Sequence, residues 1–262
     1  MLIMDWNDFI YDKPTTSRFI SATIGVFDGV HLGHVALLSR IINRSHDKII
    51  PTVFTFRNNP KTSLGRMIIT ADIFSLEQKL RSFSILGIGL VVIIDFSGEF
   101  GKLSGKDFIG LLKNRGKLRY LAVGSDFRCG YGLDTNAADI RYMNELDGIP
   151  TEIVPPIIWG GVPVSSSRIR AAILSGNLVE ATALLGRNVE LDLSMTPFTP
   201  GNAWVEFDVS SLRRITPPPG RYPVMISSDD SFQKVHGQVD IGTGTIRVSP
   251  TIRVSSVEFL LR

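Results

Sequence analysis

The sequence predicts a doubly wound parallel α/β domain over residues 1–187, followed by a small all-β, barrel-like domain over residues 188–262. Two observations carry this prediction. Before residue 187, apolar strand-like runs alternate with amphipathic helical stretches, the order that builds a parallel sheet covered on both faces. After that point helical periodicity gives way to short alternating stretches separated by turn residues, which is typical of a barrel.

The elements follow from these patterns. In the first domain, strands are expected where apolar and β-branched residues run together, at 20–27, 49–56, 90–94, 118–123 and 151–154. Helices are expected at 32–42, 72–86, 104–115, 136–146 and from 165 to 185, with a break at Gly176-Asn177. Residues 1–18 are expected to form an edge strand or a lead-in. In the second domain, five or six strands are expected, among them 203–209, 222–227, 233–241, 245–248 and 257–261.

Composition favours a cytoplasmic protein with a sizeable core. The chain has 262 residues, of which 44% are hydrophobic and 20% charged. No apolar run reaches the roughly 18 residues needed to span a bilayer, and the N-terminus lacks the pattern of a signal peptide. The single cysteine, Cys129, fits a reducing compartment. The net charge is only +3 and the basic residues are scattered, so we expect small-molecule partners, no nucleic acid, no membrane, and a monomer or weak oligomer.

The stretch TIGVFDGVHLGH, residues 23–34, predicts a nucleotide-phosphate site. A strand ends here, a tight turn follows, and a helix begins, whose N–H groups and partial positive charge attract anions. His31 and His34 are three residues apart, so both imidazoles are expected to project towards one point, where they can donate hydrogen bonds to a phosphoryl transition state. The specified positions are Gly25, Phe27, Asp28, Gly29, His31, Gly33 and His34.

Three alternatives remain for this stretch. His31 could only cap the helix, the two histidines could bind a metal, or Asp28-Gly29 could be a plain turn. The metal alternative is disfavoured because no third His or Cys ligand with regular spacing accompanies the pair.

The segment Ser165-Ser166-Ser167-Arg168-Ile169-Arg170 predicts a second phosphate site. Hydroxyls and N–H groups lie at a helix start, and two arginines in its first turn offer planar forks suited to phosphate oxygens. The alternative is that the serines form only a helix cap.

A third cluster, GSDFRCG at 124–130, predicts contacts to a planar acceptor. Asp126 could hydrogen-bond a ring N–H or a ribose, while Phe127 could stack on a ligand or fill the core. Cys129 is expected to be a packing residue. The residues Asn58-Asn59-Pro60 could line the same cleft or form only a turn.

All these clusters follow the ends of predicted strands, at 28–34, 57–60, 124–130 and, one loop later, 165–170. In doubly wound sheets, ligands bind at the carboxyl ends of the strands. We therefore expect a single active site.

Together the clusters resemble the bacterial riboflavin kinase/FMN adenylyltransferase (bifunctional FAD synthetase) family, of the His-x-Gly-His nucleotidyltransferase superfamily with its Rossmann-like sheet. The matching stretches are GVFDGVHLGH (25–34), TFRNNP (55–60), GSDFRCG (124–130) and VSSSRIR (164–170), and the match closes at LLGR (184–187). The resemblance implies transfer of AMP from ATP, with Mg2+, to the phosphate of FMN, giving FAD and pyrophosphate.

The resemblance also implies roles for individual residues. The catalytic residues would be His31, His34 and Arg170. The ATP-binding residues would be Gly25, Phe27, Asp28, Gly29, Gly33, Ser166, Ser167 and Arg168. The FMN-binding residues would be Asn59, Pro60, Asp126, Phe127 and Arg128. No protein ligand for a metal is implied.

The sequence departs from the family in two places. Asn58-Asn59-Pro60 stands where the family usually has Pro-His-Pro, and the kinase motif Gly-Phe-Pro-Thr-Ala-Asn is missing from residues 188–209. We therefore expect a shortened barrel that does not phosphorylate riboflavin. The alternatives are a nucleotidyltransferase for another phosphorylated acceptor, or a catalytically weak flavin- or nucleotide-binding module.

Overall fold

The structure is a computed structural model that describes residues 1–11, 19–58, 71–96, 100–209, 212–228, 231–250 and 253–261. The chain forms two compact units, each described by itself. The first comprises Met1–Phe27, Gly33–Ile69 and Lys79–Pro163, and the second comprises Asp28–Leu32, Thr70–Gln78 and Val164–Arg262.

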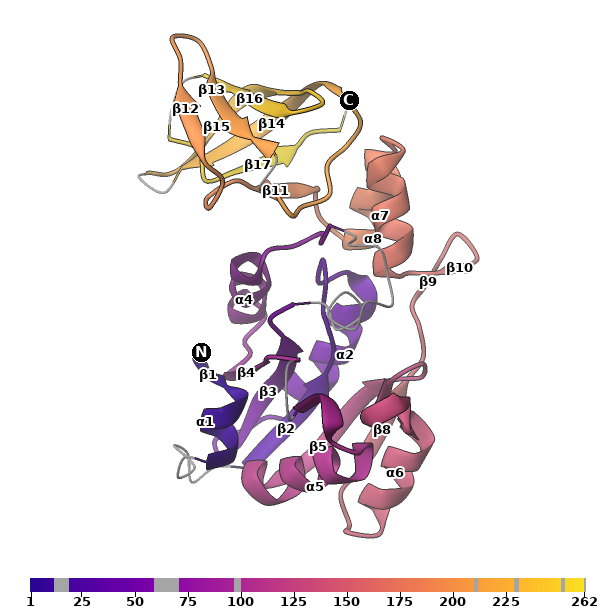
Figure 1. Cartoon of the computed structure of the whole chain (residues 1–262). Coiled ribbons are helices and arrows are strands. Elements are labelled where there is room, and N and C mark those ends of the chain that lie inside the picture. Colours follow the sequence, from indigo (N-terminus) through magenta and orange to yellow (C-terminus); the bar gives the residue numbers. More distant parts are fainter. Residues whose placement is uncertain are drawn as a thin grey trace. The chain divides into compact units, whose positions relative to one another are not determined.

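A six-stranded parallel sheet forms the centre of the first unit, with the strand order β1-β4-β3-β2-β5-β8 (Figure 1). Its strands are β1 (Leu2–Asp5), β2 (Phe19–Ile24), β3 (Ile49–Phe56), β4 (Leu90–Ile94), β5 (Leu118–Gly124) and β8 (Thr151–Val154). The chain builds outward from β2 through β3 to β4 and then returns to place β5 on the other side of β2. This order confirms the predicted doubly wound sheet and puts its reversal point beside β2 and β5.

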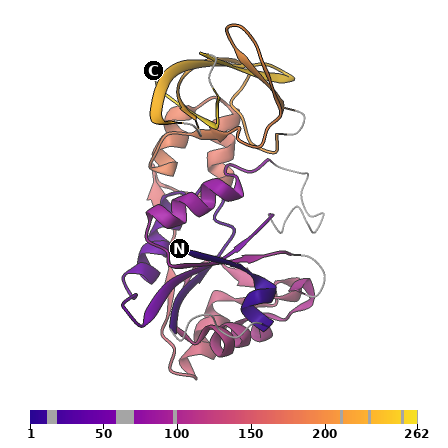
Figure 2. The ribbon, with the colours of Figure 1, turned by 90° about the vertical axis from the view of Figure 1, so that its left-hand side faces the viewer.

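Helices cover both faces of this sheet (Figure 2). The helices α1 (Trp6–Tyr11), α5 (Gly105–Gly116) and α6 (Ala137–Glu145) lie on one face, and α2 (Leu32–Ile42) and α4 (Leu76–Ile85) lie on the other. The predicted cap at Ser104 is confirmed, since its hydroxyl accepts a hydrogen bond from the N–H of Asp107 at 3.1 Å. Short elements complete the unit: η1 (Phe100–Lys102), β6 (Arg128–Cys129), η2 (Tyr131–Leu133), β7 (Thr135–Asn136), β9 (Ile158–Trp159) and β10 (Val162–Pro163).

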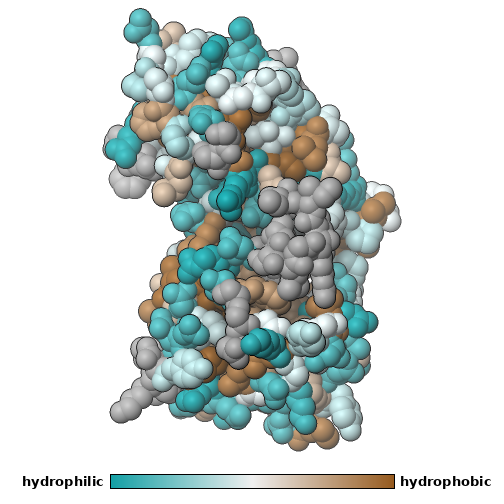
Figure 3. Space-filling model, in the orientation of Figure 1, coloured by the Kyte–Doolittle hydropathy of each residue, from teal (hydrophilic) through white to brown (hydrophobic). Residues whose placement is uncertain are grey.

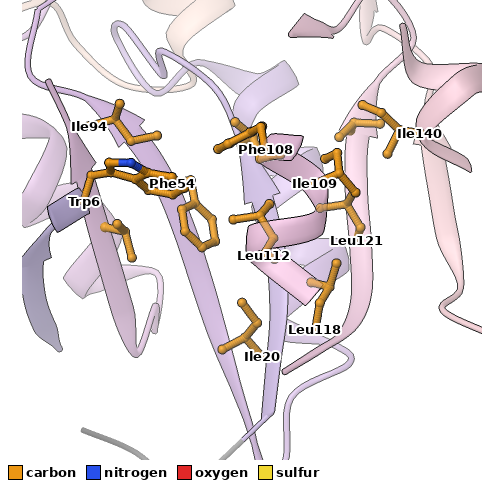
Figure 4. Close-up of a cluster of buried hydrophobic side chains, with 14 of the residues drawn as sticks. Trp6, Ile20, Phe54, Ile94, Phe108, Ile109, Leu112, Leu118, Leu121 and Ile140 are labelled. Carbon is orange, nitrogen blue, oxygen red and sulfur yellow. The ribbon is translucent and has the colours of Figure 1, made fainter. Parts of the chain in front are cut away.

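Alternation along the strands divides the buried residues between these two faces. On β2, Ile20 and Ala22 point into a hydrophobic cluster with the residues of α1, α5 and α6 (Figure 4). Ser21 lies between them and donates a hydrogen bond to the Ile41 carbonyl of α2 at 2.8 Å. The large side chains labelled in the cluster are Trp6, Ile20, Phe54, Ile94, Phe108, Ile109, Leu112, Leu118, Leu121 and Ile140. Burial of each stabilises the fold by about 1.5–3 kcal/mol, and so holds the strand ends in place.

The second unit combines two helices with an antiparallel sheet. The helices are α7 (Ser166–Leu174) and α8 (Leu178–Leu185), and the seven-stranded sheet has the order β11-β17-β14-β15-β16-β13-β12. Its strands are β11 (Glu190–Asp192), β12 (Phe198–Pro200), β13 (Val205–Asp208), β14 (Gly220–Ser228), β15 (Ser231–Ile241), β16 (Thr245–Ser249) and β17 (Ser256–Phe259). The sheet curves as in a half-open barrel, which confirms the predicted all-β region (Figure 1). Five or six strands were expected, and the difference arises because β11 and β12 span only three residues each, too few to show alternation.

The surface mixes hydrophilic and hydrophobic residues on the face that Figure 3 shows. On the curved sheet, exposed charges meet in pairs across strands, as between Arg247 of β16 and Glu206 of β13 at 2.6 Å. None of the helices in the described ranges is long and apolar enough to span a bilayer.

Candidate functional site

The turn that follows β2 has an unusual backbone. Phe27 and Val30 have positive φ angles of 53° and 37°, and Gly29 has a φ of 78°. Positive φ is uncommon outside glycine and is a clear outlier for a β-branched valine. Each such residue costs on the order of 1–3 kcal/mol and persists only where the surrounding structure holds it. The contacts around this turn therefore show which residues hold its backbone in this conformation.

Asp28 fastens the turn to two other segments of the second unit. Its carboxylate accepts hydrogen bonds from the N–H groups of Ile73 and Phe74, each at 3.0 Å, and pairs with the guanidinium of Arg170. Its backbone carbonyl accepts a hydrogen bond from Ser166 Oγ at 2.9 Å. Asp28 is only 4% exposed, and a buried carboxylate is stable only with such partners. The turn and the start of α7, the two predicted phosphate sites, are thereby joined.

The start of α7 divides its polar residues between capping and cross-helix contacts. Ser165 caps the helix by accepting a hydrogen bond from the N–H of Arg168 at 3.3 Å. The Arg168 side chain pairs with Glu180 of α8 at 2.7 Å, and Ser167 is exposed. Among the predicted phosphate residues of this segment, Ser166 and Arg170 are thus the two whose side chains contact Asp28.

His31 is the last residue before α2, and it is buried, with 6% of its surface exposed. Desolvation by this burial, together with the positive charge of Arg187, lowers the pKa of the imidazole from 6.5 to about 4. The ring is therefore neutral at physiological pH. A neutral imidazole carries one N–H donor and one acceptor nitrogen, so His31 can donate a single hydrogen bond without first gaining a proton.

Arg187 contacts this turn, although the sequence suggested no role for it. Its guanidinium donates to the carbonyl oxygens of Gly29 and Val30, the second at 3.0 Å, and lies 4.7 Å from the centre of the Phe74 ring. The sequence signal is a glycine directly after a helix, since Gly186 ends α8 with a φ of 73° and turns the chain back. Nothing in the local pattern shows which carbonyls the following arginine reaches.

Other predicted residues lie in the first unit. His34 is in the first turn of α2, one residue after Gly33, and its ring lies 5.1 Å from that of Phe27 in an edge-on contact. A Cβ atom on Gly25 would lie 3.1 Å from the same phenyl ring, so packing favours a glycine there. The convergence of His31 and His34 on one phosphate stays a prediction.

A buried lysine holds the backbone just before Phe27. Lys79 of α4 is 5% exposed, and its ammonium donates to the carbonyls of Phe56 at 3.0 Å and Val26 at 3.4 Å. The hydroxyl of Thr55 also donates to the Val26 carbonyl, at 3.3 Å. Burying an ammonium is costly unless it is hydrogen-bonded, so this contact fixes the end of β2 relative to β3. Helical periodicity gave no sign of Lys79, because an inward-pointing cation breaks the apolar stripe.

The residues predicted to hold a flavin follow β5. Because β5 pairs directly with β2, this loop begins at the strand end next to Gly25. Asp126 and Arg128 are exposed, whereas Phe127 is partly buried against the hydrophobic cluster of Figure 4. The contact favours the core-filling alternative for Phe127 and leaves Asp126 and Arg128 at the surface of the loop.

Two further sequence inferences concern neighbouring positions. Desolvation and the nearby negative charge of Asp134 raise the pKa of the Cys129 thiol to about 12, which agrees with the packing role expected for it. Asn59 and Pro60, which were predicted to contact FMN, lie outside the described residues.

The chain is similar to known proteins. A family model described as FAD synthetase matches residues 13–168, more than half of the chain. The bifunctional riboflavin kinase/FMN adenylyltransferase of Escherichia coli (strain K12) is 32% identical over 166 residues, which cover 63% of this chain and 53% of that protein. The FAD synthetase of Listeria monocytogenes is 29% identical over 171 residues, covering 65% of this chain and 70% of that protein. The chain thus spans about half the length of the Escherichia coli relative.

A solved structure shares the fold over the whole chain. The crystal structure of a protein described as a macrolide-efflux protein from Streptococcus pneumoniae has a TM-score of 0.80 and 24% identity. The likeness covers 99% of this chain and 89% of that one, and at this identity it concerns the fold alone.

Replacing Asp28 with Asn should destabilise the protein by about 3–5 kcal/mol, because it leaves the largely buried Arg170 guanidinium without its counter-charge. The matched control is Asp240→Asn in the same unit, whose partner Arg221 is 70% exposed, and this change should cost less than about 1 kcal/mol. Urea unfolding measures both variants. Equal losses for the two would contradict the structural importance of the Asp28 contact.

The burial of His31 predicts a pH dependence of stability. The unfolded imidazole titrates near pH 6.5 and the folded one near 4, so the unfolded state binds the proton first as the pH falls. His31 therefore adds no pH dependence above about pH 6.5, and between there and pH 4 it lowers the free energy of unfolding by up to roughly 3 kcal/mol. The difference in unfolding free energy between wild type and His31→Gln, followed from pH 7 to 4, should show this loss. Parallel curves for the two proteins would argue against a lowered pKa.

Proposed function

This chain belongs to the FAD synthetase family, and from that premise we propose that it transfers AMP from ATP to the phosphate of FMN. The products are FAD and pyrophosphate. The observation that carries the proposal is the junction between the two predicted phosphate sites, in which Asp28 pairs with Arg170 and accepts from Ser166 through its carbonyl. A histidine-bearing turn and a helix start are thereby held in one unit, as a nucleotide with several phosphates requires.

The proposed reaction is a direct displacement. An oxygen of the FMN phosphate bonds to the α-phosphorus of ATP, the bond from that phosphorus to the bridging oxygen breaks, and pyrophosphate leaves with the electron pair. Such transfers depend on positioning and on stabilising charge, and they need no covalent enzyme intermediate. Neutral His31 would donate its N–H to an α-phosphate oxygen as charge develops there.

The start of α7 would hold the outer phosphates. Arg170 contacts Asp28 through Nη2 and the Ala71 carbonyl through Nε, and its Nη1 group carries two more N–H donors for a phosphate oxygen. The first N–H groups of this nine-residue helix add a partial positive charge. His34 would supply the second imidazole, and Asp126 would hydrogen-bond the flavin.

We assign no protein ligand to Mg2+. Asp28, the carboxylate of the turn, already accepts two backbone N–H groups and the Arg170 guanidinium. Within the described ranges, His, Cys, Asp and Glu side chains form no group of three that could hold a metal ion. The ion would enter with ATP, bound by phosphate oxygens and water.

Three narrower proposals follow from the sequence. The chain would not phosphorylate riboflavin, because residues 188–209 lack the kinase motif of the family. The changed residues at 58–60 favour a second candidate, a nucleotidyltransferase for another phosphorylated acceptor. The single cysteine, Cys129, supports a cytoplasmic location.

The test is incubation of the purified protein with Mg-ATP and FMN, and in parallel with riboflavin. FAD and pyrophosphate from FMN, with no product from riboflavin, are expected. Turnover only with other phosphorylated acceptors would refute FMN as the substrate and support the second candidate function. Flavin binding without pyrophosphate release would reduce the chain to a binding module, and FMN formed from riboflavin would overturn the loss of kinase activity.

His31→Ala should lower the turnover rate of FAD synthesis about 100-fold while FMN affinity stays within a few-fold of wild type, because its hydrogen bond strengthens in the transition state. The control is His236→Ala on the exposed face of β15, which should leave both quantities unchanged. Steady-state kinetics and fluorescence titration of FMN measure the two effects. Weaker FMN binding with an unchanged turnover rate would refute the role given to His31.

Asp126→Ala should act on the other substrate. We expect FMN affinity to fall about tenfold, with ATP affinity unchanged, since the exposed carboxylate of Asp126 lies on the loop predicted to hold the flavin. Asp47→Ala, another exposed aspartate of the same unit, serves as the control. Equal FMN affinity in both variants and wild type would remove Asp126 from the flavin site.

A further inference from the structure

The peptides on either side of Val30 are held by one side chain. Arg187 donates from Nη1 to the Val30 carbonyl at 3.0 Å and from Nη2 to the Gly29 carbonyl. Nη1 also donates to the carbonyl of Leu185 at 3.2 Å, at the end of α8. A planar guanidinium can span three acceptors in this way because its donors form a rigid fork.

Further contacts fix the guanidinium itself. Its central carbon, Cζ, lies 4.7 Å from the centre of the Phe74 ring, a cation–π contact with a side chain that is only 4% exposed. The backbone N–H of Phe74 in turn donates to the Asp28 carboxylate at 3.0 Å. The same short segment therefore anchors both Arg187 and Asp28, and through them both ends of the turn.

The contact between Arg187 and the two carbonyls also determines where the neighbouring peptide N–H groups point. In a trans peptide the C=O and the following N–H point in opposite directions. When Arg187 draws the carbonyls of Gly29 and Val30 towards itself, the N–H groups of Val30 and His31 point away from it. Successive N–H groups that point to one side, in a turn containing positive φ angles, form a concave site for an anion.

We propose that Arg187 is a positioning residue of the nucleotide site, which orients the N–H groups of Val30 and His31 towards a phosphate of the nucleotide. The inference rests on the proposed function for the identity of that phosphate. In this role Arg187 acts through the backbone, since its Nη1 and Nη2 groups donate to the carbonyl side of the two peptides. It sustains the positive φ of Val30, which the valine side chain disfavours.

The charge of Arg187 has a second effect on the same turn. It disfavours protonation of His31 and so adds to the effect of burial. Asp28, the other charged residue of the turn, pairs with Arg170 of α7. A change at Arg187 is therefore expected to alter both the direction of the N–H groups and the titration of the imidazole, and two substitutions can separate these effects.

The test compares Arg187→Lys, which keeps the charge but loses the fork, with Arg187→Gln, which loses both. Both variants should bind inorganic pyrophosphate about tenfold more weakly and form FAD about 10- to 100-fold more slowly, with FMN affinity unchanged. The pKa of His31, followed by NMR, should rise in Arg187→Gln and stay low in Arg187→Lys. Arg221→Gln, at an exposed arginine of the same unit, should match wild type throughout.

Several outcomes would overturn the inference. Wild-type pyrophosphate affinity in a folded Arg187 variant would do so, as would pyrophosphate binding to wild type that leaves the amide signals of Val30 and His31 unmoved. The amide measurement needs no variant, so it decides the matter even if both substitutions prevent folding. A wild type that binds pyrophosphate through these amides but makes no FAD would refute the proposed function and leave the inference standing.

Discussion

The buried carboxylate of Asp28 is the contact on which the rest of the site depends. It links three segments that lie far apart in the sequence: the turn itself, the segment with Ile73 and Phe74, and α7 with Arg170. Each partner satisfies part of a charge that would otherwise be costly to remove from water. Because the loss of one partner would leave a buried charge uncompensated, the turn and the two segments around it stabilise one another.

The turn itself illustrates how a fold maintains an unfavourable backbone. Positive φ angles at Phe27 and Val30 cost energy that local contacts within the turn cannot recover. In each unit a buried or partly buried cation hydrogen-bonds to the adjacent carbonyls, Lys79 to Val26 in the first and Arg187 to Val30 in the second. When cations bind the carbonyl side of these peptides, the N–H groups point to the opposite side. An anion can bind there, because it needs hydrogen-bond donors.

The sequence could predict the regular elements well, because their signals are local. The residues 49–56, 90–94 and 151–154 form strands at the expected bounds, since each is an apolar run between clear breakers. The caps at Ser104 and Ser165 also have a local signal, because each serine hydroxyl stands just before an amphipathic stretch. Three-residue strands such as β11 were missed, because alternation cannot be recognised over so short a span.

The same limit explains what was missed in the site. The motif residues Asp28, Ser166 and Arg170 could be named from spacing and resemblance, but their contacts with one another depend on tertiary structure. Arg187 and Lys79 act on backbone carbonyls, and an acceptor that every residue carries leaves no signature in the sequence. Their roles can be recognised only when the fold shows which distant carbonyls lie next to them. The ligand roles of the motif residues stay predictions.

The C-terminal sheet also has a structural role that needs no kinase chemistry. The segment that supplies two N–H donors to Asp28 pairs through its backbone with the connection between β13 and β14. Asp72 donates to the Arg213 carbonyl at 3.2 Å, and Ile215 donates to the Asp72 carbonyl at 3.0 Å. At the other end of this segment, Gln78 donates to the Glu190 carbonyl of β11 at 3.4 Å. Most of these are bonds between backbone atoms, so they constrain the path of the chain and leave side chains free to change. A sheet that lost the kinase motif would still hold Ile73 and Phe74 against Asp28, and this requirement is a physical reason for such a sheet to persist beside a nucleotide site.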